Sequence, residues 1–206
     1  EVFQEGLVIP PVRLYKKGVF QEDLLSLVLN NVRTPSERSG DLNAQLAALR
    51  TGQKRLTELA YKHGPAHLQA GFTAMLDYAE RRIRKRIAEL PDGLYVAEDA
   101  LDNDGVTLDP VPVKVAITIS GDTISIDFAG SGGILQGNIN AVAPMTYSAT
   151  FYAIKVFTNP DIPVNGGTFR PIEICIPENC FLNAQRPAAV CAGNTETTHR
   201  VCDTVL

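Results

Sequence analysis

The stretch ISIDFAGSGGILQGNINAVAPMTYSATFY, residues 124–152, decides most of what this sequence predicts about the fold. Ile124, Ile126 and Phe128 alternate with polar residues, which is the period of a half-buried strand. Four glycines then follow within eight positions, and a helix-like run begins near Ala141. A strand, a glycine loop and a helix start can together build a site from backbone N–H groups. The alternative is a loop that needs glycine only for tight turns.

Two further strands are predicted just before this stretch. Residues 94–101 and 111–120 show the two-residue period, and Asn-Asp-Gly at 103–105 is typical of a turn between them. Three sequential strands with short turns predict an antiparallel meander. The remaining elements expected in this half of the chain are a helix over 141–157 and a strand over 170–176.

The first half of the chain has the helical period instead. Thr34-Pro35 with Glu37 is a helix start, because threonine can cap, proline fits the first position and the glutamate follows at the third. Leucines at steps of three, four and seven residues continue this helix to about His63, where Gly64-Pro65 ends it. A second helix is expected to reach about residue 90, and a short one covers 21–31. Two long helices joined by Gly-Pro predict an antiparallel hairpin.

The predicted class is therefore α+β: a long antiparallel helical hairpin, then an antiparallel β-meander with a glycine loop and a packed helix. We expect an extended segment with a short helix over 1–33, the hairpin over 34–90, and an α+β portion over 91–206. The chain begins with Glu1 rather than Met, and its last residues resemble the uncapped opening of an amphipathic helix. We therefore expect a fragment of a longer polypeptide, truncated at both ends of the parent fold.

Composition narrows the class of protein. The 206 residues are 45% hydrophobic and 20% charged, which is typical of a globular chain. The net charge of −4 gives no basic surplus for nucleic acid, and no apolar run approaches the roughly 18 residues of a membrane span. No secretory signal is visible, so we expect a cytoplasmic protein with free thiols, the alternative being disulfides in a secreted chain. The four cysteines are Cys175, Cys180, Cys191 and Cys202.

Two polar clusters are candidates for chemistry. His63 and His67 have metal-ligand spacing, but Gly64-Pro65 breaks the helix between them, so no metal site is predicted there. The second cluster runs from residue 192 to 200. Asn194 can cap the helix that follows, and Glu196 and Arg200 have the i,i+4 spacing of an ion pair. This cluster is either a capped helix with one surface ion pair, or a set of acid–base or carboxylate-binding groups facing a cleft.

Seven short stretches of the sequence together resemble consecutive blocks of the hydantoinase B/oxoprolinase family. They are FQEGLVIPPV at 3–12, NVRTPSERSGDL at 31–42, LPDGLY at 90–95, DFAGS at 127–131, GNINA at 137–141, FRPI at 169–172 and GNTET at 193–197. Their order and spacing hold across essentially the whole chain.

The resemblance implies a hydantoinase B-type subunit of an ATP-dependent amidohydrolase that opens hydantoin, 5-oxoproline or lactam rings. It also implies a hetero-oligomer with a hydantoinase A-type subunit or domain, which binds ATP and phosphorylates the small-molecule substrate. The family blocks with likely divalent-metal ligands lie upstream of the FQEG block. We therefore expect ATP and metal in the full protein, none bound to this fragment, and no activity of the fragment alone. The alternative is a subunit-docking module of a related ketone carboxylase, with no catalytic residues of its own.

The resemblance and the positions at loop and helix starts together select six candidate site residues. The catalytic candidates are Glu196, Arg200 and Glu5, and the substrate-binding candidates are Asn138, Asn140 and Asn194. In this hypothesis the glutamate at 196 orients a water or a metal ligand, and the arginine at 200 holds that glutamate or an anionic intermediate. His199 stands where many members of the family carry glutamine, which weakens a catalytic role for it.

Overall fold

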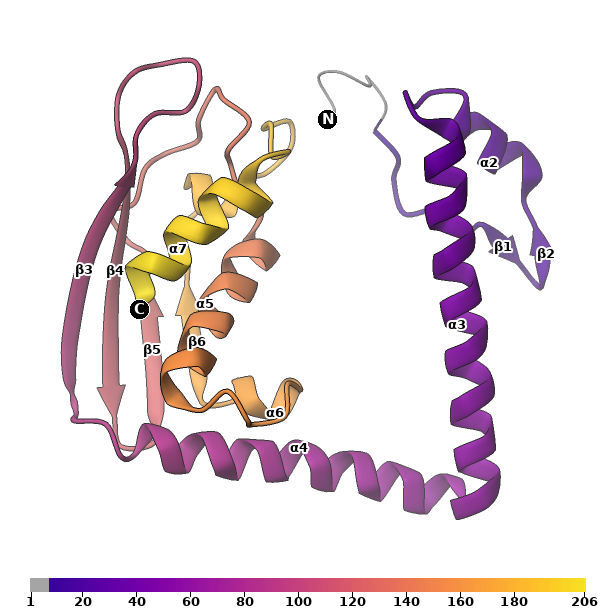
Figure 1. The fold of residues 1–206 in the computed structure, drawn as a ribbon, viewed down its shortest axis with the longest axis horizontal. Coiled ribbons are helices and arrows are strands. Elements are labelled where there is room, and N and C mark those ends of the chain that lie inside the picture. Colours follow the sequence, from indigo (N-terminus) through magenta and orange to yellow (C-terminus); the bar gives the residue numbers. More distant parts are fainter. Residues whose placement is uncertain (1–7) are drawn as a thin grey trace. The chain divides into compact units, whose positions relative to one another are not determined.

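The computed structural model describes residues 8–206 (Figure 1). The candidate Glu5 and the block around it lie outside the described residues. Contacts divide the chain into two compact units, one ending at Gly71 and the other running from Phe72 to Leu206. This division differs in position from the three parts expected from the sequence, which stay a prediction. Each unit is described by itself.

The first unit is built on one long helix, α3 (Pro35–His63). Before it come a two-stranded hairpin, β1 (Tyr15–Lys16) with β2 (Val19–Phe20), and the short helix α2 (Glu22–Leu29). Arg50 of α3 donates a 2.8 Å hydrogen bond to the Tyr15 hydroxyl, which fastens the hairpin to the helix. The sequence predicted α2 but missed this hairpin, because strands of two residues carry no measurable period.

Helix α3 starts and ends where the sequence places it. Pro35 is the first helical residue after Thr34, and Gly64 adopts a φ of 82° directly after His63. The Thr34 side chain makes no capping hydrogen bond, so the predicted cap by its hydroxyl is wrong. Helix α4 (Pro65–Ile87) follows at once and crosses from the first unit into the second. Because the unit boundary falls within α4, the packing of the two helices as a hairpin stays a prediction.

The second unit contains a four-stranded sheet in the order β3-β4-β5-β6. Its strands are β3 (Gly93–Leu101), β4 (Val111–Ser120), β5 (Thr123–Asp127) and β6 (Ile172–Cys175). The first three form the predicted antiparallel meander. Strand β6 pairs in parallel with β5, with Ile124 opposite Ile172, and α5 (Ala143–Thr158) and α6 (Gly166–Phe169) connect these two strands. The α+β class is therefore confirmed.

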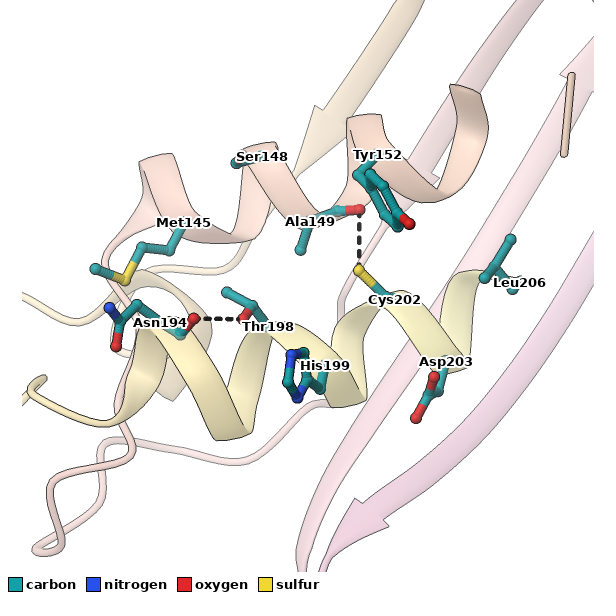
Figure 2. Close-up of a pocket in the computed structure, with 10 residues that line it drawn as sticks. All are labelled: Met145, Ser148, Ala149, Tyr152, Asn194, Thr198, His199, Cys202, Asp203 and Leu206. Atoms are coloured by element: carbon teal, nitrogen blue, oxygen red, sulfur yellow. Dashed lines mark hydrogen bonds between the residues drawn. The ribbon is translucent and has the colours of Figure 1, made fainter. Parts of the chain in front are cut away.

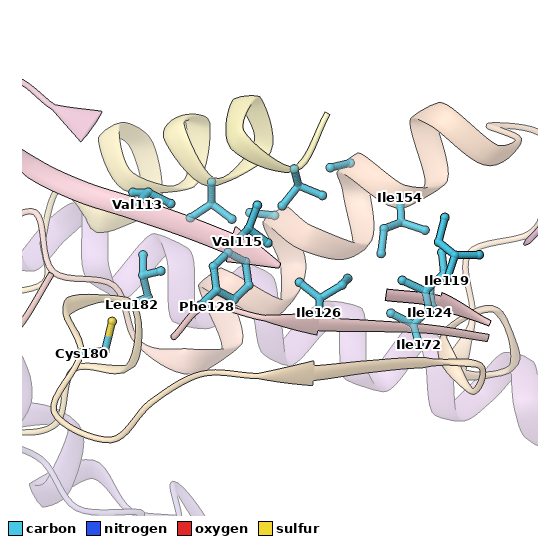
Figure 3. Close-up of a cluster of buried hydrophobic side chains, with 14 of the residues drawn as sticks. Val113, Val115, Ile119, Ile124, Ile126, Phe128, Ile154, Ile172, Cys180 and Leu182 are labelled. Atoms are coloured by element: carbon cyan, nitrogen blue, oxygen red, sulfur yellow. The ribbon is translucent and has the colours of Figure 1, made fainter. Parts of the chain in front are cut away.

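The core lies on one face of this sheet (Figure 3). Alternate residues of β4 and β5 point into it, among them Val113, Val115 and Ile126. Helix α5 supplies Ile154, and α7 (Thr198–Val205) contacts both β3 and β4. No helix of the described chain is long and apolar enough to cross a membrane. Residues 8–206 contain no disulfide.

The second half of α4 is part of the same core. Ile83 and Ile87 are fully buried there, as their helical spacing predicts. Arg170, which follows α6, holds the polar side of the helix by 2.8 Å ion pairs to both Asp77 and Glu80. The hydrogen bond from Arg170 is the main reason that the pKa of Glu80 lies below its ordinary value.

Candidate functional site

The glycine loop between β5 and α5 is organised around one buried side chain, that of Asn140. Its Oδ1 accepts the N–H of Leu135 at 2.9 Å. Its amide nitrogen donates to the carbonyls of Leu135, Gly137 and Ala189 at 3.1, 2.9 and 2.9 Å. Asn140 is completely buried, so all of its hydrogen-bonding capacity is used inside the protein. In the structure, this predicted substrate-binding residue stabilises the loop through internal hydrogen bonds.

A second polar residue, Asp104, holds the same loop from the β3–β4 connection. Its Oδ1 accepts the N–H groups of Val106 and Thr107 at 2.9 and 2.7 Å, and its Oδ2 accepts that of Gly137 at 3.1 Å. These three donors, Thr107 first, hold the pKa of the Asp104 carboxyl well below its ordinary value of 3.8. A Cβ on Gly137 would lie 1.7 Å from the Asp104 carbonyl oxygen, so only glycine fits at this contact.

The start of the C-terminal helical segment docks onto this loop. A single π-helical turn, Gly193–Thr197, precedes α7. Thr197 donates its hydroxyl proton to the Ile139 carbonyl, and the Ala192 N–H donates to the Asn138 carbonyl at 2.9 Å. A Cβ on Gly193 would lie 2.0 Å from the carbonyl oxygen of Asn140. The two family blocks, 137–141 and 193–197, are thus packed backbone against backbone.

The remaining candidates stand on or beside this junction. Asn138, Asn194 and Glu196 are all exposed. Asn194 does not cap the helix: Ala192 holds the N-cap position and no side chain caps it, which corrects the prediction. Within residues 8–206 the Glu196 carboxylate makes no ion pair, whereas Arg200 forms one with Asp99 of β3. The predicted Glu196–Arg200 pair is therefore wrong, because a carboxylate on the neighbouring strand takes the guanidinium.

The Arg200–Asp99 pair joins α7 to the edge strand of the sheet. The N–H of Ala100 and then Arg200 lower the pKa of Asp99, so this carboxylate is ionised at neutral pH. The Arg200 Nε is buried and has no partner among the described residues. Arg200 thus holds α7 against strand β3 of the sheet. Glu196 is left without the ion-pair partner that the sequence predicted for it.

A pocket of about 800 Å³ opens between α5 and α7, next to the π-helical turn (Figure 2). Its lining residues are Met145, Ser148, Ala149, Tyr152, Asn194, Thr198, His199, Cys202, Asp203 and Leu206. Asn194 is the one predicted site residue among them. The thiol of Cys202 donates to the Ala149 carbonyl at 3.4 Å, and burial raises its pKa, so it is a protonated packing group rather than a nucleophile.

Apart from Asn194, the polar lining of this pocket comes from groups that sequence reasoning missed or discounted. His199 and Asp203 are one turn apart on α7, and Tyr152 comes from α5 (Figure 2). The family resemblance weakens a role for the histidine at 199, and nothing in the sequence pairs it with α5. The pocket offers hydrogen-bond donors and acceptors to a small polar molecule.

Two observations on the described residues bear on metal and phosphate binding. Residues 8–206 contain no group of three or more His, Cys, Asp or Glu side chains arranged to hold a metal. Three N–H groups of the glycine loop are paired inside the protein: those of Ser131, Gly132 and Gly137 donate to Phe128, Pro112 and Asp104. A phosphate cradle needs such groups unpaired. These three groups are not open to a phosphate, and no chemical step is assigned to a metal or nucleotide held by the loop.

The chain belongs to the hydantoinase B/oxoprolinase family, whose family model matches residues 1–206. It is 32% identical to the beta subunit of the caprolactamase of Pseudomonas jessenii, over 91% of this chain and 32% of the relative. It is 28% identical to the B subunit of a putative D-/L-hydantoinase of a Pseudomonas species, over 100% of this chain and 36% of the relative. The chain thus spans about a third of the length of these curated relatives.

One solved structure agrees with this assignment and a second shares the fold. The crystal structure of ATP-dependent caprolactamase from Pseudomonas jessenii matches 100% of this chain and 35% of its own, with a TM-score of 0.90 and 30% identity. A nucleotide-free acetone carboxylase structure matches 89% of this chain and 26% of its own, with a TM-score of 0.73. At 19% identity the second likeness shows a shared fold alone.

Proposed function

We propose that this chain is part of a hydantoinase B-type subunit of an ATP-dependent amidohydrolase that opens cyclic amides such as hydantoin, 5-oxoproline or a lactam. The likeness to caprolactamase across the whole chain, at a TM-score of 0.90, is the observation that carries the proposal. Relatives named as beta and B subunits support a hetero-oligomer. We infer that the partner is a hydantoinase A-type subunit or domain and that the assembly works in the cytoplasm.

ATP bound by that partner supplies the phosphoryl group that activates a poor amide electrophile. This chain's own contribution is to hold the exposed side chains of one side of the substrate site in position. Asn140 and Asp104 fix the glycine loop, and the loop fixes the π-helical turn that presents Asn194 and Glu196 to solvent. In the proposal Asn194 and Asn138 orient the substrate. Glu196 orients the attacking water, and Arg200 sets the position of α7 that the turn depends on.

One observation favours the alternative, a docking module of a ketone carboxylase with no catalytic residues of its own. The Asn140 side chain and the N–H groups of Ser131, Gly132 and Gly137 in the glycine loop are used in internal hydrogen bonds. If the exposed residues of the turn are equally dispensable, this part of the protein serves assembly only. The fold shared with acetone carboxylase is compatible with that role.

The test is a reconstituted complex of the full-length protein with its hydantoinase A-type partner and ATP. Ring opening of caprolactam, hydantoin and 5-oxoproline is measured beside carboxylation of acetone. Glu196→Gln should lower kcat by roughly 10²-fold, the usual contribution of a positioned acid–base group, and leave thermal unfolding unchanged. Glu178→Gln, an exposed glutamate in a turn, is the matched control.

Each outcome separates the two functions. Wild-type kinetics in Glu196→Gln would remove Glu196 from the mechanism. Carboxylation of acetone without opening of any cyclic amide would replace the hydrolase with the carboxylase module.

A further inference from the structure

The pocket between α5 and α7 is formed by one compact unit alone. All ten of its lining residues lie between Met145 and Leu206, within the second unit. Its volume of about 800 Å³ lies in the range of small-molecule sites. Asn194 and Met145 stand at one end of it, and Tyr152 and Leu206 lie toward the other (Figure 2). The lining therefore does not depend on where the first unit lies.

The least exposed part of the lining, which we call the floor, is largely apolar. It consists of Met145, Ala149, Thr198 and Cys202. Its two polar hydrogens are already paired. The Cys202 thiol donates to the Ala149 carbonyl at 3.4 Å, and the Thr198 hydroxyl donates to the Asn194 carbonyl at 2.9 Å. A ring of methylene groups can therefore lie on this floor without leaving a donor unpaired.

The rim of the pocket has the opposite chemistry. Ser148, Tyr152, Asn194 and His199 are exposed, and within residues 8–206 their side chains make no hydrogen bond. Together they can donate to a carbonyl oxygen and accept from an N–H group. A cyclic amide presents a carbonyl and an N–H on an otherwise apolar ring, so it matches the rim and the floor together.

The charge of the lining limits which ring the pocket can take. Asp203 is the one charged side chain of the ten when histidine is counted as neutral, and none is lysine or arginine. Asp203 has no ion pair among the described residues, and Arg200, one turn earlier on α7, is paired with Asp99 instead. The charge is felt at the floor, since burial and then the Asp203 carboxylate raise the pKa of the Cys202 thiol. An anion in this pocket would meet a carboxylate that no lining cation neutralises.

We propose that this pocket holds the ring of the substrate and that Asp203 makes it selective for uncharged cyclic amides over rings that carry a carboxylate. The inference rests on the proposed function, from which it takes the reaction but not the preference among substrates. Of the substrates named there, hydantoin and a lactam are uncharged, whereas 5-oxoproline is an anion. Like charges brought together at a binding site oppose binding, so 5-oxoproline is the substrate that this protein should use least well.

A matched pair of probes isolates the carboxylate, because 2-pyrrolidinone and 5-oxoproline share one lactam ring and differ by that group alone. The full-length protein, in complex with its hydantoinase A-type partner and ATP, should open 2-pyrrolidinone with a kcat/KM at least about tenfold above that for 5-oxoproline. Asp203→Asn should reduce this ratio about tenfold, and Asp203→Lys should reduce it further. Asp109→Asn, at an exposed aspartate of the β3–β4 connection outside the pocket, should leave the ratio as it is.

Binding of the same two probes to the full-length protein without ATP is a second measurement, and it does not depend on turnover. Titrations followed by ligand-observed NMR should give a lower Kd for 2-pyrrolidinone than for 5-oxoproline. Ser148→Phe, which adds an aromatic ring at the rim, should raise the Kd of 2-pyrrolidinone at least about tenfold by blocking the pocket. Val156→Phe, at a 43% exposed residue of α5 outside the lining, is the matched control.

The two proposals fail in different ways. If the wild-type complex opens no cyclic amide, the proposed function fails, and the binding measurement still decides the inference. Three results would overturn the inference even where the wild type opens cyclic amides: a preference for 5-oxoproline, a ratio that Asp203→Asn leaves unchanged, or binding of 2-pyrrolidinone that Ser148→Phe does not weaken.

Discussion

Gly193 is the glycine of the C-terminal helical segment that lies against the backbone of the glycine loop. A Cβ there would lie 2.0 Å from the Asn140 carbonyl oxygen and 2.7 Å from its carbon, and both of these are backbone atoms. We expect Gly193→Ala to lower the free energy of unfolding by at least about 2 kcal/mol, because the backbone must shift to admit the methyl group. Urea denaturation followed by circular dichroism measures this change.

Gly40→Ala is the matched control, since a Cβ there meets nothing within 4 Å and the residue lies inside α3. Alanine should leave stability unchanged or raise it by up to about 1 kcal/mol through helix propensity. A Gly193→Ala protein as stable as the wild type would show that the close contact relaxes without cost.

The same scale shows what the sequence could not reveal about Asn140. Its block and its position at a helix start favoured a substrate ligand. Its partners are backbone carbonyls, one of them at Ala189, 49 residues away. Backbone acceptors leave no trace in residue types, so no pattern could have revealed that this amide was already bound.

At the scale of elements, the Asp104 carboxylate joins the β3–β4 connection to the glycine loop by accepting the N–H of Gly137. Its hydrogen bonds lower the pKa of this carboxyl group in the folded protein. A group whose pKa is lower in the folded than in the unfolded state stabilises the fold above its unfolded pKa. That contribution disappears as the pH falls toward the folded value. Stability of the wild type should therefore fall between about pH 4 and pH 2. Asp104→Asn should be less stable at pH 7 and should lose less over that acid range.

Urea titrations at pH 7, 4, 3 and 2 measure this difference, with Asp102→Asn as the exposed control in the same connection. Parallel pH profiles for wild type and Asp104→Asn would contradict the role given to this carboxylate.

Elements themselves were largely predictable, and their partners were not. Strand β4 occupies the predicted residues 111–120, and α3 begins and ends within a residue of its expected limits. Local signals, a two-residue period and a Thr-Pro start with a Gly-Pro stop, fix such bounds. The parallel pairing of β6 with β5 and the π-helical turn at 193–197 depend on contacts made across the chain. The ion pair that Arg200 makes with Asp99 depends on the same kind of contact.

For the molecule as a whole, every hydrophobic residue of the buried core within residues 8–206 lies between Ala79 and Val205. The second compact unit therefore holds the apolar burial that drives folding. A chain reduced to residues 72–206 should unfold cooperatively, with a Tm within about 5 °C of the full chain's. Differential scanning calorimetry measures it. Loss of the cooperative transition in the shortened chain would mean that the first unit supplies stability that its exposed helix does not suggest.

Three glycines have a consequence for the history of this fold. Gly137, Gly167 and Gly193 each press against a backbone carbonyl far away in the chain, those of Asp104, Leu76 and Asn140. A side chain at any of them would lie within 2.0 Å of that oxygen. An ancestor could accept such a substitution only after the opposing segment had moved. Glycine should therefore be replaced least often at these three positions among homologous sequences. A homologue that lacks one of these glycines should carry an insertion or deletion in the segment whose carbonyl lies opposite.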